Sequence, residues 1–158
     1  MNIALIAHDS RKKELIDWVN YNRSTLMNHT LYATGTTGKL IKGISTKISV
    51  YDKEEDWYMF EDKVHSLLSG PLGGDQQVGA MIAEGKIDVL IFFCDNLIQQ
   101  GHQNDVSALS RLASLYNIPF ATNRTTADMI LTSPLLYDKN YHKVVPDCIE
   151  NYKNRTLK

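Results

Sequence analysis

The chain has 158 residues, of which 43% are apolar and 22% charged, and its formal net charge is −1. This composition predicts one globular domain, residues 1–158, and gives no electrostatic basis for binding nucleic acid or an anionic membrane. The apolar N-terminal run is too short for a signal peptide or a membrane span, and two cysteines without metal-ligand spacing favour a reducing compartment, so we expect a cytoplasmic protein.

Apolar runs and amphipathic stretches alternate along the chain. The predicted strands are NIALIAHD (2–9), LYATG (31–35), IDVLIFFCD (87–95) and IPFATN (118–123). The predicted helices cover residues 12–26, 39–43, 75–86, 104–117 and 125–133, with Thr125 or Thr126 as the last N-cap. Continuous apolar strands indicate a sheet that is buried on both faces. The alternation therefore predicts a single-domain, three-layer α/β fold with a mainly parallel, Rossmann-like sheet.

Residues 44–66 interrupt this alternation. They mix β-branched and aromatic residues with six acidic ones. The segment fits a short hairpin or an amphipathic helix that covers the fold. The composition favours a surface insertion with a partly solvated acidic face.

Polar residues follow each predicted strand. In an open parallel sheet, ligands bind beyond the carboxyl ends of the strands, and here these ends read His8-Asp9, Thr34–Gly38, Asp95 and Thr122-Asn123. Their convergence on one edge predicts a binding site there. Lys12, four residues after His8, suits a phosphate ligand and equally a solvated position on a helix.

The segment TGTTG (34–38) joins a strand to a short helical stretch. Its glycines allow a tight turn, its threonines offer hydroxyl groups, and a helix N-terminus favours an anion, so phosphate is the expected ligand. The spacing does not match a P-loop, and ATP is not indicated. The alternative is a plain turn between strand and helix.

The segment SGPLGGDQQVGA (69–80) places one carboxylate, Asp75, at the start of a helical pattern. Asp is a common N-cap, and capping alone would explain it. The preceding Pro71, Gly73 and Gly74 instead indicate backbone that comes close to a ligand. Such a ligand would meet Ser69 and the amide of Gly70.

His102 stands in GHQND, and Asp105 would either orient its ring or cap the next helix. No H-x-x-x-H pair or Cys/His cluster supports zinc, and no metal site is predicted. The chain has no G-x-S-x-G segment, so acyl chemistry on a serine nucleophile has no support.

Taken together, IALIAHD, LYATGTTG, SGPLGGDQQVGA, GKIDVLIFF and IPFATN resemble the methylglyoxal synthase family over nearly the whole chain, except 44–66 and the last residues. The fold also resembles the regulatory domain of carbamoyl phosphate synthetase and the cyclohydrolase domain of purine synthesis. Those two domains lack this full set of motifs. The resemblance implies a lyase that converts dihydroxyacetone phosphate to methylglyoxal and inorganic phosphate without a cofactor. It further implies a homohexamer that phosphate inhibits allosterically.

The resemblance also implies roles for particular residues. Asp75 would be the catalytic base, and His102 would handle protons at the substrate oxygens. The implied substrate contacts are His8, Lys12, Thr34, Gly35, Thr36, Thr37, Ser69, Gly70 and His102. The implied supporting carboxylates are Asp9, Asp95 and Asp105, and Arg155 matches a basic residue that reaches a neighbouring subunit's site.

Two departures from the family pattern are visible. GHQND lacks the proline before the histidine and the DPD-like sequence after it, and the segment between TGTTG and SGP is long. The alternative function is a non-catalytic regulatory domain that senses a phosphate ligand on the same fold. Such a sensor would use TGTTG without requiring Asp75 or His102.

Overall fold

The computed structural model describes residues 1–48, 56–97 and 103–156. These residues form a five-stranded parallel sheet in the order β5-β2-β1-β6-β7. The strands are β1 (Asn2–Ala7), β2 (Thr30–Ala33), β5 (Val64–Ser66), β6 (Val89–Phe93) and β7 (Phe120–Ala121). The predicted parallel α/β fold is therefore confirmed, and the four predicted strands all lie in this sheet.

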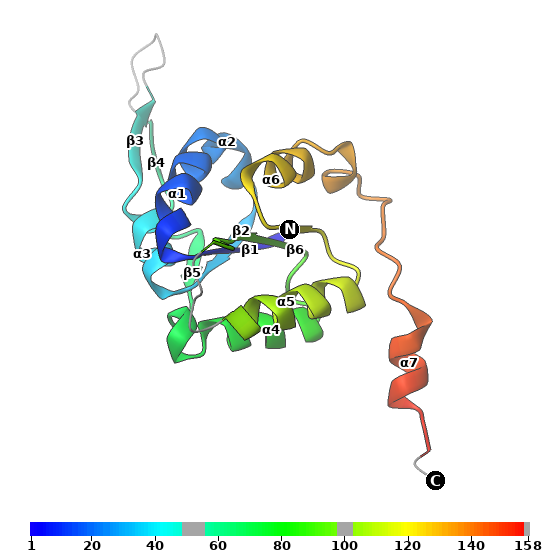
Figure 1. The fold of residues 1–158 in the computed structure, drawn as a ribbon. Coiled ribbons are helices and arrows are strands. Elements are labelled where there is room, and N and C mark those ends of the chain that lie inside the picture. The colour runs from blue at the N-terminus through cyan, green and yellow to red at the C-terminus, as the bar shows by residue number, and fades with distance from the viewer. Residues whose placement is uncertain (49–55, 98–102, 157–158) are drawn as a thin grey trace.

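Helices cover both faces of the sheet, which makes three layers (Figure 1). On one face lie α1 (Lys12–Tyr21), α2 (Arg23–Leu26), α3 (Gly35–Lys42) and α6 (Arg124–Leu131); on the other lie α4 (Gly74–Ala83) and α5 (Gln103–Leu115). The continuous predicted helix over 12–26 is broken at Asn22, whose amide N–H bonds to the Trp18 carbonyl oxygen.

Alternation along β1 and β6 supplies each face with its own core. Leu5 and Ile91 point to the layer that contains Trp18, whereas Ile6 and Phe92 pack with Val78 and the other residues of the second layer. Full burial of such side chains contributes about 1.5–3 kcal/mol each. Because β1 and β6 are covered on both sides, their sequences are almost entirely apolar.

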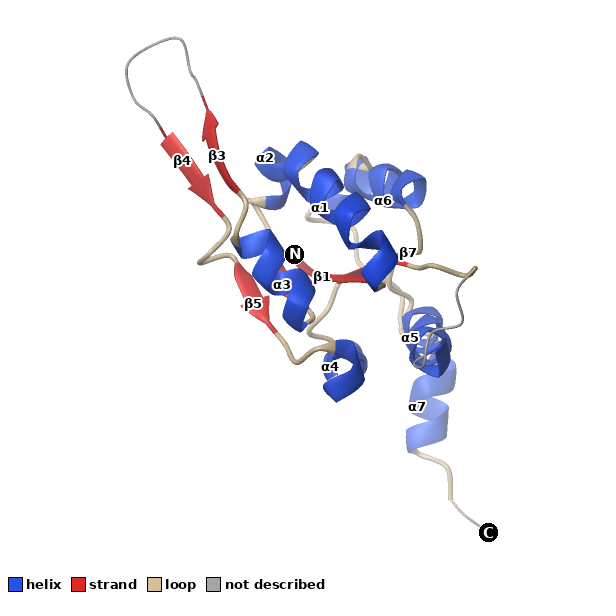
Figure 2. Cartoon of the chain, turned by 60° about the vertical axis from the view of Figure 1, so that its left-hand side comes forward, coloured by secondary structure: helices blue, strands red, loops and turns tan. Residues whose placement is uncertain are grey.

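The long connection between α3 and the main sheet contains an antiparallel hairpin. Its strands are β3 (Ser45–Ile48) and β4 (Asp56–Met59), and the hairpin extends away from the layers (Figure 2). The hairpin alternative is thus what the structure shows. The strand β5 was not predicted: residues 64–66 pair with β2 at the sheet edge, and Phe60 is fully buried. Three residues are too few to give a readable alternation.

Within the described residues, three 3-10 turns and a last helix complete the fold. The turns are η1 (Asp9–Arg11), η2 (Gly70–Leu72) and η3 (Pro134–Leu136), and the helix is α7 (Asp147–Lys153). In Figure 1, α7 follows an extended segment; its Ile149 is buried, and residues of α7 line a pocket together with residues at the end of α4. Among the described residues, no helix is both long and apolar enough to span a bilayer.

Candidate active site

A cavity of about 280 Å³ opens at the carboxyl edge of the sheet. It is lined by Ile6, Ala7, His8, Asp9, Lys12, Thr34, Thr36, Thr37, Ser69, Gly70, Pro71, Asp75 and Phe92. These residues follow β1, β2 and β5, or belong to β1 and β6. After β5 the chain crosses back to pair β6 with the free side of β1, which creates the switch point where open α/β sheets bind ligands.

His8 fixes the loop after β1 to the loop after β6. The His8 Nδ1 accepts a hydrogen bond from the Asp95 backbone N–H at 2.8 Å, and the His8 N–H donates to the Phe93 carbonyl oxygen at 3.2 Å. An Nδ1 that accepts places the ring proton of a neutral imidazole on Nε2. His8 is buried and packs edge-on against Phe92. The structure thus presents His8 as a rigid donor.

Lys12 supplies positive charge at the cavity. It begins α1, and its Nζ is paired with the Asp9 carboxylate. The Lys12 side chain is 20% exposed, whereas that of Asp9 is 88% exposed. Of the two alternatives for Lys12, the structure shows the position at the cavity wall rather than a fully solvated one.

The TGTTG segment is itself the first turn of α3. The helix begins at Gly35, earlier than the predicted start at residue 39, with Thr34 as an extended N-cap. The N–H groups at a helix start have no partner within the helix, and the positive end of its dipole attracts anions. The Thr37 hydroxyl is buried and has no hydrogen-bond partner among the described residues, although it lines the cavity. A buried polar atom without a partner is costly, which indicates a ligand there.

Gly35 allows the two glycine-rich segments to touch. A Cβ at Gly35 would stand 2.8 Å from the Ser69 nitrogen, and the Gly35 N–H donates to the Leu68 carbonyl oxygen at 3.0 Å. Gly35 does not line the cavity itself. It brings the start of α3 and the loop before α4 together as neighbouring walls.

The loop 69–74 turns sharply into α4. Gly73 adopts φ +102, which disfavours other residues, and a Cβ at Gly74 would stand only 2.0 Å from the Leu68 carbonyl oxygen. Gly73 is the N-cap of α4, and Asp75 lies in the first helical turn. The alternative in which Asp75 caps the helix is therefore not what the structure shows, because the left-handed Gly73 takes the N-cap position.

The Asp75 carboxylate is directed into the loop instead. It is 5% exposed, and the Cβ that Gly70 lacks would stand 2.8 Å from Asp75 Oδ2. The absence of a side chain at Gly70 thus leaves room for the carboxylate beside the backbone. A buried carboxylate on a rigid helix start, next to an anion-binding turn, is suited to proton abstraction.

The remaining predicted residues lie around the cavity or outside the described residues. Asp95 accepts hydrogen bonds from the Ser10 hydroxyl and, at 3.0 Å, from the Leu97 N–H; Asp105 accepts one from the Gln76 side chain at 2.8 Å. Neither carboxylate belongs to the described lining. His102 falls outside the described residues.

The strand end Thr122-Asn123 does not contribute to the site. Asn123 caps α6, and its Oδ1 accepts the Thr126 N–H at 3.0 Å. Thr125 and Thr126 are therefore not the cap. The wall residues Ile6, Ala7 and Phe92 were not predicted as part of the site. Their positions at the carboxyl ends of two predicted strands could have indicated them.

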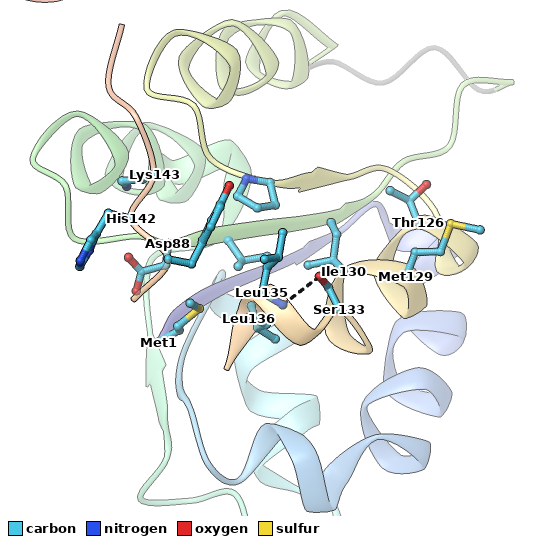
Figure 3. Close-up of a pocket in the computed structure, with 13 residues that line it drawn as sticks. Met1, Asp88, Thr126, Met129, Ile130, Ser133, Leu135, Leu136, His142 and Lys143 are labelled. Carbon is cyan, nitrogen blue, oxygen red and sulfur yellow. Dashed lines mark hydrogen bonds between the residues drawn. The ribbon is translucent and has the colours of Figure 1, made fainter. Parts of the chain in front are cut away.

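A larger cavity of about 550 Å³ lies at the opposite, amino edge of the sheet. Figure 3 shows it lined by apolar groups such as Ile130, Leu135 and Leu136, with Ser133 accepting the Leu135 N–H. Asp88 on its wall already accepts the Asn2 N–H at 2.8 Å. The smaller cavity, with its threonines, Lys12 and a buried carboxylate, is the one with the groups for phosphate chemistry. In the described part of the chain, no cluster of His, Cys, Asp or Glu is arranged to hold a metal ion.

Known proteins resemble this chain in sequence and in fold. Residues 14–122 match the family described as MGS-like domain. A methylglyoxal synthase of Maridesulfovibrio salexigens is 55% identical over 156 residues, covering 99% of this chain and 97% of the relative. One from Leptospira interrogans serovar copenhageni is 50% identical over 143 residues, 90% of this chain and 86% of the relative. The crystal structure of methylglyoxal synthase from Elizabethkingia anophelis NUHP1 superposes with a TM-score of 0.80 at 41% identity, covering 99% of this chain and 92% of that one.

Proposed function

Because this chain belongs to the methylglyoxal synthase family, we propose that the cavity beside Asp75 is where dihydroxyacetone phosphate becomes methylglyoxal and inorganic phosphate. The chain is a methylglyoxal synthase, a lyase that breaks a carbon–oxygen bond. The observation that carries the assignment of the site is the buried Asp75 carboxylate placed directly beside Gly70, on the wall next to the start of α3.

The phosphate group of the substrate would bind at the start of α3. Thr34, Thr36, Thr37, Ser69 and Gly70 all line the cavity there. The buried Thr37 hydroxyl would donate a hydrogen bond to a phosphate oxygen, and Lys12 would supply a full positive charge. Gly35 acts through the close approach to Ser69 rather than by contact.

Asp75 would act as the general base. It removes a proton from the hydroxymethyl carbon, and the electron pair moves into an enediolate. General-base catalysis of this kind accelerates a reaction by roughly 10²–10⁴-fold. Its burial and its place on α4 restrict the motion of the carboxylate, as a positioned general base requires.

Two histidines would donate hydrogen bonds or protons to the substrate oxygens. His8, fixed by Asp95, offers its Nε2–H toward the cavity as a neutral donor. His102 would stabilise the developing oxyanion and move a proton between the oxygens. A preorganised donor of this type is worth about 2.7–4 kcal/mol. Asp9, Asp95 and Asp105 would support them as charged or hydrogen-bonded neighbours.

Elimination follows from the position of the phosphate. The carbon–oxygen bond to phosphate breaks, its electron pair leaves with the phosphate, and the remaining enol tautomerises to methylglyoxal. The bond must stand perpendicular to the enediolate plane so that its antibonding orbital overlaps the π system. The α3 turn would hold the phosphate out of that plane and stabilise the leaving dianion.

The proposal extends to the domain organisation, the compartment and the assembly of the protein. We expect residues 1–158 to act as one domain, since the main sheet uses residues 2–121, with the hairpin as an insertion. We expect a cytoplasmic homohexamer that inorganic phosphate inhibits, and Arg155 to reach a neighbouring subunit's site. No cofactor is proposed. Size-exclusion chromatography with light scattering tests the assembly.

The decisive experiment compares Asp75→Asn with the unaltered chain. The variant should lose nearly all methylglyoxal production and still bind inorganic phosphate, measured by calorimetry. Near-normal turnover would remove Asp75 as the base. If the unaltered chain itself bound phosphate without any turnover, that result would favour the sensor alternative. His102→Gln should slow product formation by orders of magnitude, and a mild effect would limit His102 to binding.

A further inference from the structure

The two glutamines after Asp75 have no role in the reaction as described so far. We propose that Gln77 is a positioning residue that holds the phosphate-binding loop against the helix that carries the base. The inference rests on the proposed function of this cavity. Gln77 does not line the cavity, so any effect it has on substrate must pass through the loop.

Gln77 reaches back from α4 to the residue before Ser69. Its Oε1 accepts a hydrogen bond from the Leu68 N–H at 2.8 Å, while its own backbone N–H bonds to the Gly73 carbonyl oxygen at 3.0 Å. The side chain therefore spans the whole loop 69–73, from its exit to its entrance. Without it, this connection between the two ends depends on the backbone turn alone.

Leu68 is held through both of its backbone groups. Its N–H donates to Gln77, and its carbonyl oxygen accepts the Gly35 N–H at 3.0 Å. Gly35 is the first residue of α3, and Gly74, at the start of α4, packs closely on the same carbonyl. One residue thus links the helix that binds phosphate to the helix that bears the base.

The neighbouring glutamine serves a different connection. Gln76 donates from Nε2 to Asp105 Oδ1 at 2.8 Å, which ties α4 to the start of α5. Each glutamine therefore has one partner in a different segment. A pair of solvated helix residues would not need two such separate contacts.

The expected effect of Gln77 is on binding geometry more than on folding. The bond lies at the surface, and water can replace it at the Leu68 N–H when the side chain is lost. A typical hydrogen bond of this kind contributes about 0.5–1.5 kcal/mol, which corresponds to roughly a two- to tenfold change in affinity. The loop would remain folded but would sample positions where Ser69 and Gly70 no longer meet the phosphate.

The test compares two substitutions at this position. Gln77→Met keeps the length of the side chain and removes the acceptor, whereas Gln77→Glu keeps an oxygen acceptor. Glu84→Gln, on an exposed residue at the end of the same helix, is the control. For each variant we would measure kcat and KM for dihydroxyacetone phosphate, the Kd for inorganic phosphate, and Tm, at high ionic strength so that the added charge is screened.

We expect Gln77→Met to raise both KM and the phosphate Kd by about five- to tenfold, with kcat within about twofold and Tm nearly unchanged. Gln77→Glu and Glu84→Gln should remain near the unaltered values. An unchanged KM and Kd in Gln77→Met would overturn the proposal. Equal losses in both Gln77 variants with a lowered Tm would also overturn it, since they would show a packing role. If the unaltered chain made no methylglyoxal, the proposed function would fail, while the phosphate Kd would still report on Gln77.

Discussion

The close approach at Gly35 can be tested by adding a single methyl group. A Cβ there would stand 2.8 Å from the Ser69 nitrogen and 3.0 Å from its Cα, both of which are backbone atoms. Ordinary contact begins near 3.4 Å, so Gly35→Ala must separate α3 from the loop by about 0.6 Å. Unlike a side-chain end, the backbone of Ser69 cannot rotate away.

We expect Gly35→Ala to lower stability moderately and to lower turnover strongly. Overpacking costs about 1–3 kcal/mol, and the better helix propensity of Ala returns about 1 kcal/mol. We therefore expect a loss of up to about 2 kcal/mol, or a Tm lowered by up to about 8 °C. A displacement approaching 1 Å at a reacting centre reduces turnover by up to about 100-fold, so kcat/KM should fall far more than stability.

The assay combines methylglyoxal production with thermal unfolding. Gly43→Ala, at the other end of α3, is the matched control, because its Cβ would meet only the Leu40 and Lys39 carbonyl oxygens, at the ordinary contact distances of 3.4 and 3.6 Å. That change should keep activity and raise stability by about 0.4–1 kcal/mol. Full activity in Gly35→Ala would refute the claim that this contact sets the position of the phosphate site.

Three further predictions address the base and two titrating groups. Gly70→Ala should lower turnover at least tenfold with Tm nearly unchanged, because the new Cβ would stand 2.8 Å from Asp75 Oδ2 and turn the carboxylate away; normal turnover would contradict this. Burial, followed by the nearby N-terminal ammonium, lowers the pKa of His29, so the folded state binds fewer protons and stability should fall as pH drops below 6.5. Urea midpoints between pH 5 and 7 measure this, and His29→Gln should reduce the change of the midpoint with pH. The same change in the variant and in the unaltered chain would contradict the assignment to His29. Burial raises the pKa of the Cys94 thiol to about 11, so iodoacetamide at pH 8 should modify the exposed Cys148 and spare Cys94, as peptide mass spectrometry would show; alkylation of Cys94 in the folded protein would count against it.

Much of the fold could be predicted because burial on both faces leaves a direct mark on sequence. The strands β1 and β6 are nearly all apolar, and the sheet covers both of their faces with helices. The short strand β5 could not be predicted, because three residues at a sheet edge carry no pattern of their own. The cap of α6 was misassigned, and the capping alternative for Asp75 at α4 is not observed, because Asn123 and Gly73 compete for those positions with residues that look equally suitable.

The sequence by itself determined which residue types gather at the carboxyl edge of the sheet. The segments TGTTG and SGPLGGDQQVGA contain the threonines, glycines and carboxylate that phosphate chemistry requires, and a parallel sheet brings strand ends together. Only the tertiary structure decided how these segments meet. It showed that Gly35 touches Ser69, that Asp75 lies beside Gly70 rather than capping its helix, and that Gln77 holds Leu68. Local patterns report which face is buried, whereas contacts between loops and helix starts, such as that of Gly35 with Ser69, depend on the packing of the whole chain.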